Sequence, residues 1–379
     1  MHYAVGAKLL SPRERIKAAV ETCRLRQLPP AGIAQALRQE DTEGPELQKI
    51  KEWHNVDRSV FENEILPGDE PAVMKALMRD WPAVEASTRS PADIAGYLKQ
   101  FDAGGAVNGI VGAPQIDGRF FYSDDLKGFN FEQRRVTVSA ALDTLLPLAD
   151  AVEPPAIALQ AIPVAEVLPK FLDDNPMPLL NGRILPRIWL GNRTRIATHF
   201  DNNHNIACVV SGSRRFTVFP PDQVANLYIG PLLRTPGGSP ISMVDLRAPD
   251  YPAFPKFRDA LESAQEALLE PGDAIFIPIL WWHGVESLGP LNILVNYWWN
   301  DAESVHDKPF LSLAHSMLLL SRLPAAQRDA WRAMFDHFVF QTHGESGGHL
   351  PPDVQDLQRN LTAEERDQVK ALLAKHLQP

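Results

Sequence analysis

The stretch Arg195-Ile196-Ala197-Thr198-His199-Phe200-Asp201 is the part of the sequence around which the rest of the chain is organised. It is a β-prone segment, and side chains alternate between the two faces of a strand. His199 and Asp201 are separated by one residue, so an extended backbone points both side chains to the same face. The stretch therefore predicts a strand that presents an imidazole and a carboxylate side by side.

A second histidine, His283, follows the apolar segment Ile279-Leu280-Trp281-Trp282. If a second strand brings His283 to the same place, two imidazoles and one carboxylate would occupy one face of a metal ion. Non-haem Fe(II) oxygenases use this donor set, which leaves metal positions open for other ligands. The chain contains 11 histidines, so the spacing by itself also fits a pair of structural histidines in a core.

Short β-prone segments separated by turn residues surround the His-x-Asp pair. They are Ile188–Gly191, Arg195–Phe200, Ile206–Val210, Arg215–Phe219, Ala274–Pro278 and Asn292–Trp298. A long excursion of loops and helix, from Pro220 to about Leu269, separates the fourth from the fifth. Closely spaced strands with one long insertion predict a mainly β protein with a double-stranded β-helix, the jelly-roll architecture, rather than alternating β–α–β units.

The remaining segments predict helical additions at both ends and mixed elements before the barrel. The expected helices are Ser11–Leu25, Ala31–Gln39, Ala72–Met78, Ser90–Phe101, Val136–Leu146, Pro309–Leu320, Pro324–Phe340 and Thr362–His376, and the expected additional strands include Phe61–Leu66 and Ala156–Ala161. The apolar surface of Pro309–Leu320 is broad enough to predict burial, and the apolar stripe of Pro324–Phe340 is typical of core packing. The domains expected are a helical arm at 1–50, a barrel at 51–300 and a helical region at 301–379.

Composition limits the functions that the chain can have. Its 379 residues carry a formal charge of −10, which argues against a protein that binds nucleic acid through bulk electrostatics. Cys23 and Cys208 are the only cysteines, which is consistent with a reducing cytoplasm, and Cys208 lies in an apolar run that predicts a small buried side chain. The chain shows no secretory signal and no apolar run long enough to span a membrane. We therefore expect a cytoplasmic protein.

Several further motifs are distributed over the chain. They are His199-Phe200-Asp201, the run Ser211–Pro221, Pro271-Gly272-Asp273, Ile277-Pro278, Trp281-Trp282-His283, Glu286-Ser287, Val295-Asn296-Tyr297-Trp298 and, nearer the N-terminus, Asp80-Trp81-Pro82-Ala83. Taken together, these motifs resemble the JmjC/cupin-like Fe(II)- and 2-oxoglutarate-dependent oxygenases, and among them most of all the asparaginyl hydroxylases. The resemblance covers roughly Phe61–Asn300. The helices after residue 300 are similar, less specifically, to C-terminal dimerisation helices of that family.

The resemblance implies roles for individual residues. His199, Asp201 and His283 match the iron ligands, and Asn205 and Asn296 match residues that line the 2-oxoglutarate pocket. A further residue, Arg214, stands where those enzymes place a lysine that pairs with the far carboxylate of 2-oxoglutarate. Arginine keeps the charge and can bind a carboxylate through two hydrogen bonds. The alternatives are that Arg214 is a solvated turn residue, or that the neighbouring arginine at 215 has the role.

Two residues depart from the family pattern. Ile196 replaces a threonine and Ala158 replaces a tyrosine, and both of those hydroxyls help to hold the cosubstrate in the relatives. Arg195 or Tyr122 could supply a compensating polar group. His204 lies beside the site in sequence and is either a loop histidine or a further polar group for the substrate.

The resemblance implies oxidation of a substrate coupled to decarboxylation of 2-oxoglutarate to succinate and CO₂, with hydroxylation as the usual outcome. The substrate would be a protein side chain or a small molecule, with no direct nucleic-acid or membrane partner, and the chain would form a homodimer through its C-terminal helices. Two other readings remain open. One is a metal-dependent cupin enzyme that does not use 2-oxoglutarate, and the other is a non-catalytic cupin-like interaction protein.

Overall fold

The computed structural model describes residues 47–300 and 309–377. Residues 47–300 belong to one compact unit and residues 309–377 to a second. The helices expected at Ser11–Leu25 and Ala31–Gln39 lie outside the described residues. Two strands, β1 and β2, begin the first unit, and β1 falls inside the range 1–50 that was expected to be a helical arm.

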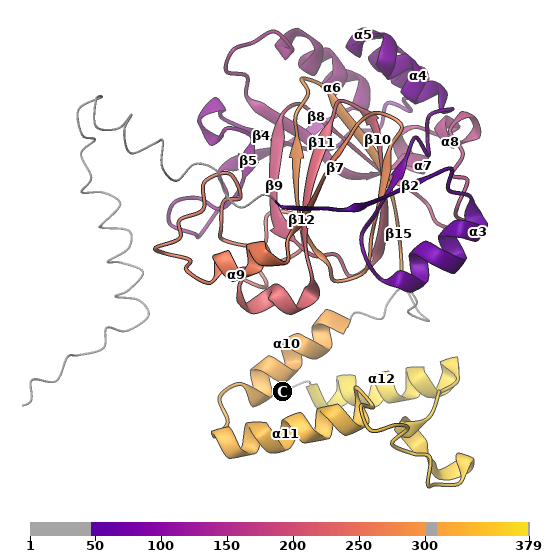
Figure 1. Ribbon diagram of the computed structural model, residues 1–379, viewed down its shortest axis with the longest axis vertical. Helices are drawn as coiled ribbons and strands as arrows, with labels where there is room; N and C mark the ends of the chain where they lie inside the picture. The colour runs from indigo at the N-terminus through magenta and orange to yellow at the C-terminus, as the bar shows by residue number, and fades with distance from the viewer. Residues whose placement is uncertain (1–46, 301–308, 378–379) are drawn as a thin grey trace, which may run out of the picture. The chain divides into compact units, whose positions relative to one another are not determined.

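The first unit is built on two β-sheets that face each other (Figure 1). The six-stranded sheet contains, in spatial order, β1 (Gln48–Lys49), β12 (Gln265–Leu269), β11 (Arg214–Phe219), β14 (Trp282–Ser287), β9 (Thr194–His199) and β5 (Arg119–Phe120). The nine-stranded sheet contains β2 (Lys51–His54), β3 (Ala72–Lys75), β13 (Ala274–Ile277), β10 (His204–Ser211), β15 (Asn292–Trp299), β8 (Arg187–Gly191), β7 (Ala156–Pro163), β4 (Val107–Gly112) and β6 (Phe131–Val136). Neighbouring strands in each sheet are mostly far apart in sequence, as in a jelly roll. The expected double-stranded β-helix is confirmed.

Alternating side chains divide the core of this unit into two clusters. On β10, Ala207 and Val209 point between the sheets, whereas Cys208 points to the opposite face. We call the buried side chains between the sheets the inner cluster; they are Ile50, Val73, Ala207, Val209, Phe216, Val218, Ala267, Leu269, Ile275, Ile277, Trp281, Val285 and Leu294. Cys208 is fully buried in the outer cluster, where the nine-stranded sheet packs against helices. The inner face is therefore the one that can hold a site.

Helices cover the outer face of the larger sheet (Figure 1). The helices of the first unit are α3 (Arg58–Val60), α4 (Pro82–Arg89), α5 (Pro91–Lys99), α6 (Val138–Leu145), α7 (Val164–Val167), α8 (Phe171–Asp174) and α9 (Phe257–Glu262), together with the short turns η1 (Phe61–Ile65), η2 (Leu66–Gly68), η3 (Pro114–Ile116), η4 (Leu146–Leu148) and η5 (Pro221–Ala225). Ser90 caps the start of helix α5 as expected, because its Oγ accepts a hydrogen bond from the Asp93 N–H at 3.0 Å.

The second unit contains α10 (Pro309–Leu320), α11 (Ala325–Phe338), η6 (Pro352–Val354), η7 (Asp356–Gln358) and α12 (Ala363–Leu377). All three helices were expected. The expected burial of Pro309–Leu320 and the core packing of Pro324–Phe340 were wrong, because neither α10 nor α11 buries any residue. Within the described residues, no helix has the length and apolar character needed to cross a membrane.

Three local predictions before and after the barrel strands were also wrong. Phe61–Leu66 is helical, because Phe61 and Ile65 are one turn apart and both bury against the outer cluster. Ala72–Lys75 is a strand rather than a helix, because it pairs with β2 on one side and β13 on the other. Gln265–Leu269 forms β12 instead of a loop or helix, since it pairs with β11. In each case long-range pairing or burial overrode the local pattern.

Candidate metal centre

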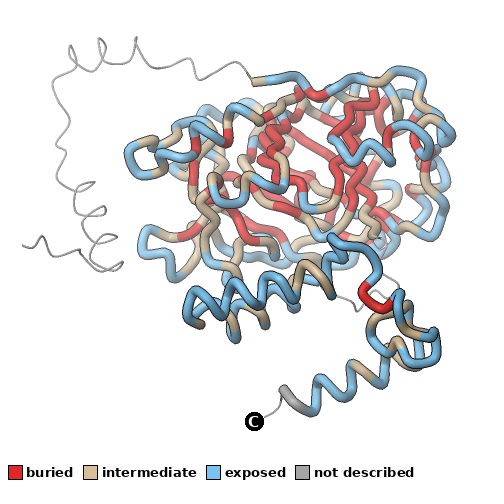
Figure 2. The backbone as a smooth tube through the Cα atoms, turned by 60° about the horizontal axis from the view of Figure 1, so that its bottom comes forward, coloured by how far each residue is buried: buried red, intermediate tan, exposed pale blue. Residues whose placement is uncertain are grey.

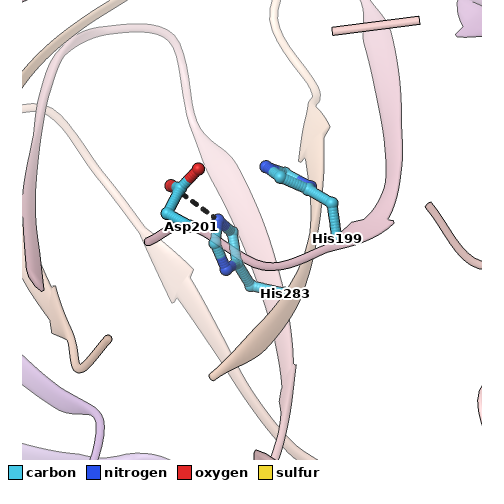
Figure 3. A group of neighbouring side chains, drawn as sticks. All are labelled: His199, Asp201 and His283. Carbon is cyan, nitrogen blue, oxygen red and sulfur yellow. Dashed lines mark ion pairs between the residues drawn. The ribbon is translucent and has the colours of Figure 1, made fainter. Parts of the chain in front are cut away.

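The three residues of the predicted metal site meet on the inner face of the six-stranded sheet (Figure 3). His199 ends β9, His283 lies near the start of β14, and the two residues are direct partners across the antiparallel pair. Their ring centroids are 4.3 Å apart. Asp201 follows β9 and brings its Oδ2 atom to 3.6 Å from His283 Nε2. The candidate ligand atoms of the three residues all lie within 4.8 Å of one another.

A β-bulge aims His199 at this position. Between the pairs His283↔His199 and Val285↔Ile196, strand β9 advances three residues while β14 advances two. Ile196 packs against the inner cluster, so strict alternation would place Thr198 rather than His199 on its face. The extra residue reverses the alternation and turns His199 inward. Gly284 lies on β14 opposite the bulge. A Cβ atom at this position would lie only 2.5 Å from Leu246 Cδ1, so a larger residue would not fit without displacing Leu246.

Backbone carbonyls set the tautomers of both imidazoles. His199 Nδ1 is 2.9 Å from the Ala197 oxygen, and His283 Nδ1 is 3.1 Å from the Trp281 oxygen. A carbonyl oxygen only accepts hydrogen bonds, so each Nδ1 carries a proton, and in the neutral form of this tautomer the lone pair is on Nε2. Metal-binding histidines are oriented in this way by a hydrogen bond from the other ring nitrogen.

Burial disfavours charge on both His283 and Asp201 in the absence of a metal ion. Burial, with a smaller contribution from neighbouring His199, lowers the pKa of His283 to about 3, against the opposing effect of the Trp281 carbonyl. Burial also raises the pKa of Asp201, and His199 opposes that change. Asp201 Oδ2 is buried and accepts no hydrogen bond from the part of the chain that the structure describes. A buried carboxylate oxygen without a partner is costly, and a divalent cation would satisfy it, so these residues fit a metal ion.

Asn205 and Asn296 extend the polar wall beside the cluster. Asn296 lies on β15 and donates from Nδ2 to Asn205 Oδ1 on β10 at 3.3 Å, and its own Oδ1 accepts from the Trp189 indole at 2.9 Å. Both asparagines are buried and lie on inward-facing positions of their strands. The amides are thus held in place by one another and by Trp189.

Arg214 begins β11 and points between the sheets with Phe216 and Val218. Its side chain is buried, with 7% of the residue exposed, and its Nε has no hydrogen-bond partner in the described ranges 47–300 and 309–377. Burial lowers the pKa of its guanidinium to about 10, so the group remains charged at neutral pH. Arg215 points the other way and pairs with Glu286 at 3.3 Å. Of the two arginines, only Arg214 can serve the inner face.

We call His199, Asp201 and His283 the metal cluster. A cavity of about 280 Å³ opens beside it. His199 and Asp201 form part of its wall, and the other lining residues are Ile110, Phe120, Phe131, Gln160, Ala161, Trp189, Ile196, Ala197, Pro236, Gly237, Ser239, Ile241 and Trp298. A smaller cavity of about 20 Å³ lies against Arg214. Gln160, Trp189 and Ile196 line both, so the two cavities adjoin. Most of the large cavity is apolar, which keeps water away from the metal cluster.

The two departures from the family pattern lie together. Ala158 and Ile196 both belong to a small apolar cluster with Ile110 and Phe120, and both line the cavity at Arg214. The suggested compensation by Arg195 or Tyr122 was wrong, because these side chains are engaged elsewhere: Arg195 pairs with Asp245 at 3.1 Å, and the Tyr122 hydroxyl donates to the Arg234 carbonyl at 2.8 Å.

His204 is not in a loop and does not reach the cavity. It lies on β10 with its ring packed against Phe276 and Trp299 on the outer face, and its Nδ1 accepts from the Ile279 N–H at 3.2 Å.

Gln160 lines the cavity but was not among the residues predicted from the sequence. The sequence does contain a signal for this role: Gln160 is the only polar residue in the predicted strand Ala156–Ala161, and it is two positions from Ala158, on the same face of an extended strand.

Comparison with known proteins places the chain in a family. Residues 58–304, well over half of the chain, match the family model described as a cupin-like domain. The chain is 36% identical over 132 residues to the lysine-specific demethylase JMJ31 of Arabidopsis thaliana, covering 35% of this chain and 22% of that protein. It is 31% identical over 119 residues to the Jumonji C domain-containing protein 5 of Drosophila melanogaster, covering 31% and 28%. It is 30% identical over 147 residues to the tRNA wybutosine-synthesizing protein 5 of Danio rerio, covering 35% and 42%.

The chain therefore belongs to the cupin-like (JmjC) domain family. It aligns with less than half of the length of each of these relatives. The barrel and the His-Asp-His cluster are the features that define its class.

Proposed function

We propose that this protein is an Fe(II)- and 2-oxoglutarate-dependent oxygenase. The observation that carries the proposal is a pair of buried polar groups without hydrogen bonds on one inner face. Within the described residues, Asp201 Oδ2 accepts no hydrogen bond beside two oriented imidazoles, and Arg214 Nε donates none at the adjoining cavity. A metal ion would satisfy the first group and a ligand carboxylate would satisfy the second.

Each residue of the site would have a separate role in binding. His199, Asp201 and His283 would hold Fe(II) through Nε2, carboxylate oxygen and Nε2. Asn205 and Asn296 would donate hydrogen bonds to the keto-acid end of 2-oxoglutarate, and Arg214 would bind its far carboxylate. When bound, iron and 2-oxoglutarate together supply activation of dioxygen and oxidative decarboxylation to succinate and CO₂. The apolar wall formed by residues such as Phe120 and Ile241 would exclude bulk water from the reacting centre.

Hydroxylation of a protein side chain or of a small molecule is the proposed outcome. The relatives named above include a lysine-specific demethylase and a protein of tRNA wybutosine synthesis, so the reaction class in the family is broader than hydroxylation of one substrate. The apolar character of the cavity favours a substrate group without charge. Further proposals are a second copy of this chain as partner, through the helices of the second unit, and the cytoplasm as compartment.

The test is an anaerobic titration with Fe(II) followed by 2-oxoglutarate, observed through the visible metal-to-ligand charge-transfer band. We expect the band in the native chain and its loss in His199→Ala. The matched control is His54→Ala, a histidine exposed on β2, which should leave the band unchanged.

Two other results would overturn the proposal in different ways. Iron binding without the band would favour a metal-dependent cupin that does not use 2-oxoglutarate, which the apolar pair Ala158 and Ile196 supports. Absence of iron binding in the native chain would favour a non-catalytic cupin-like protein.

A further inference from the structure

Three residues line both the cavity at the metal cluster and the cavity at Arg214, and only one of them has an unused polar group. Ile196 has no polar side-chain atom. The indole of Trp189 donates its N–H to Asn296 Oδ1 at 2.9 Å. Gln160 lines both cavities, and its amide forms no hydrogen bond with any residue that the structure describes. Among these three residues, only Gln160 therefore has a polar group that is free to bind a ligand between the metal cluster and the buried Arg214 guanidinium.

A second β-bulge positions this amide. Between the pairs Leu159↔Leu190 and Ile162↔Ile188, strand β7 advances three residues while β8 advances two. The bulged residues are Gln160 and Ala161, and both line the larger cavity. Bulges occur beside active sites, where they change the direction of a side chain.

The backbone of this bulge is strained and is held in place by a neighbouring side chain. Ala161 has a φ of +52°, in the left-handed region that residues with a Cβ rarely adopt. Arg187 Nη1 donates a hydrogen bond to the Ala161 carbonyl at 2.8 Å. Such conformations persist where the surrounding structure imposes them, and they are concentrated at ligand sites.

The residues around Arg214 indicate which ligand group the Gln160 amide would bind. A carboxylate that pairs with Arg214 would face the hydrocarbon of Ala158 and Ile196 together with the hydroxyls of Thr194 and Ser287, which are hydrogen-bonded to each other at 3.2 Å. A carboxylate has several lone pairs and is stabilised by more than one donor. We propose that Gln160 Nε2 is a further donor, beside Arg214, to the far carboxylate of the cosubstrate, and that Gln160 thereby helps to select 2-oxo diacids over 2-oxo monoacids. This inference rests on the proposed use of 2-oxoglutarate.

The experiment compares two ligands by calorimetry on the anaerobic, Fe(II)-loaded full chain. The probes are 2-oxoglutarate and pyruvate, which share the keto-acid end but differ in the far carboxylate. In Gln160→Leu we expect 2-oxoglutarate to bind about tenfold more weakly, the effect of losing one hydrogen bond to a charged group, and pyruvate to bind as it does to the native chain. The nearly isosteric Gln160→Glu should weaken 2-oxoglutarate binding further, because it places a second negative charge beside the carboxylate.

The matched control is Gln133→Leu, at an exposed glutamine on β6, which should change neither ligand. If the native chain binds no 2-oxoglutarate, the proposed function itself fails. If the native chain and both Gln160 variants bind 2-oxoglutarate equally well, the function stands and the role of Gln160 is refuted. Equal weakening of pyruvate and 2-oxoglutarate would also refute it, because the variant would then have disturbed the keto-acid end.

Discussion

The two units of this chain bury their apolar side chains to very different extents. In the first unit, both sheets supply an inner cluster whose members are all below a tenth exposed, and Figure 2 shows stretches of buried residues, in red, running through this unit. In the second unit, Leu318 is 77% exposed and Trp331 is 45% exposed, and Figure 2 shows mainly exposed and intermediate backbone there. Apolar sequence alone therefore does not create a core. A facing surface is needed, which the second sheet provides in the first unit.

The largest expected effect comes from a matched pair of leucines, one in each unit. Leu269→Ala removes a fully buried side chain of the inner cluster and should lower the free energy of unfolding by about 2–5 kcal/mol. In the monomeric chain, Leu318→Ala on α10 should change it by no more than about 0.5 kcal/mol. Urea denaturation of both variants measures the difference. Equal losses would mean that the two units do not differ in packing as described.

A second matched pair concerns carboxylates. Asp273 is buried, accepts hydrogen bonds from the Ala76 and Glu270 backbone N–H groups at 2.9 and 3.1 Å, and pairs with Lys75. Asp273→Ala should cost about 2–3 kcal/mol, because three donors lose their acceptor while Lys75 keeps partial access to water. In the second unit Asp329 and Arg332 form an exposed pair at 3.4 Å, and Asp329→Ala should cost about 0–0.5 kcal/mol. The same denaturation measurement applies, and similar costs for the two variants would contradict this account.

A third comparison tests what covers the exposed side chains of the second unit. If a second copy of the chain covers them, Leu318→Lys should weaken self-association at least about tenfold, because it places a charge in an apolar contact. Leu185→Lys, at a leucine that is 64% exposed in the first unit, is the control and should leave association unchanged. Light scattering coupled to gel filtration gives the mass of each variant. A native chain that is monomeric at all accessible concentrations would exclude the homodimer.

The smallest expected effect is a pH dependence confined to the second unit. Glu365 accepts from the Thr362 N–H at 2.8 Å at the start of α12 and pairs with Arg359 at 2.6 Å. The Arg359 hydrogen bond and then the Thr362 contacts lower the pKa of Glu365 from 4.5 to about 2. Because the folded pKa is depressed, the stabilisation is present above pH 4.5 and is lost as the pH falls towards about 2.

Hydrogen exchange of the α12 amides checks this expectation. Protection of the first turn of α12 should decrease between pH 4.5 and pH 2 after correction for intrinsic exchange, whereas in Glu365→Gln it should be lower at neutral pH and nearly constant over that interval. A native chain whose α12 protection does not change over this range would show that the capping contact contributes nothing.

The sequence determined a large part of the architecture and predicted the three residues of the candidate metal centre. The spacing of His199 and Asp201 and the apolar segment leading to His283 predicted three ligand residues, two histidines and one aspartate, on or next to strands, and the resemblance of the surrounding motifs implied a jelly roll. These features are local: alternation, turn residues and capping boxes act over a few residues, so a sequence displays them directly. The capping residue Ser90 is a further example.

Only the tertiary structure decided which face each side chain occupies. The bulge opposite Gly284 turns His199 inward, and the bulge at Ala161 places Gln160 between the metal cluster and Arg214. A bulge depends on which strand lies opposite and in what register, and that pairing joins residues far apart in the chain. The same cause explains why β3 formed a strand against its local pattern, and why α10 remained exposed despite its apolar sequence. Local chemistry is encoded residue by residue, whereas burial and register exist only once distant segments have been brought together.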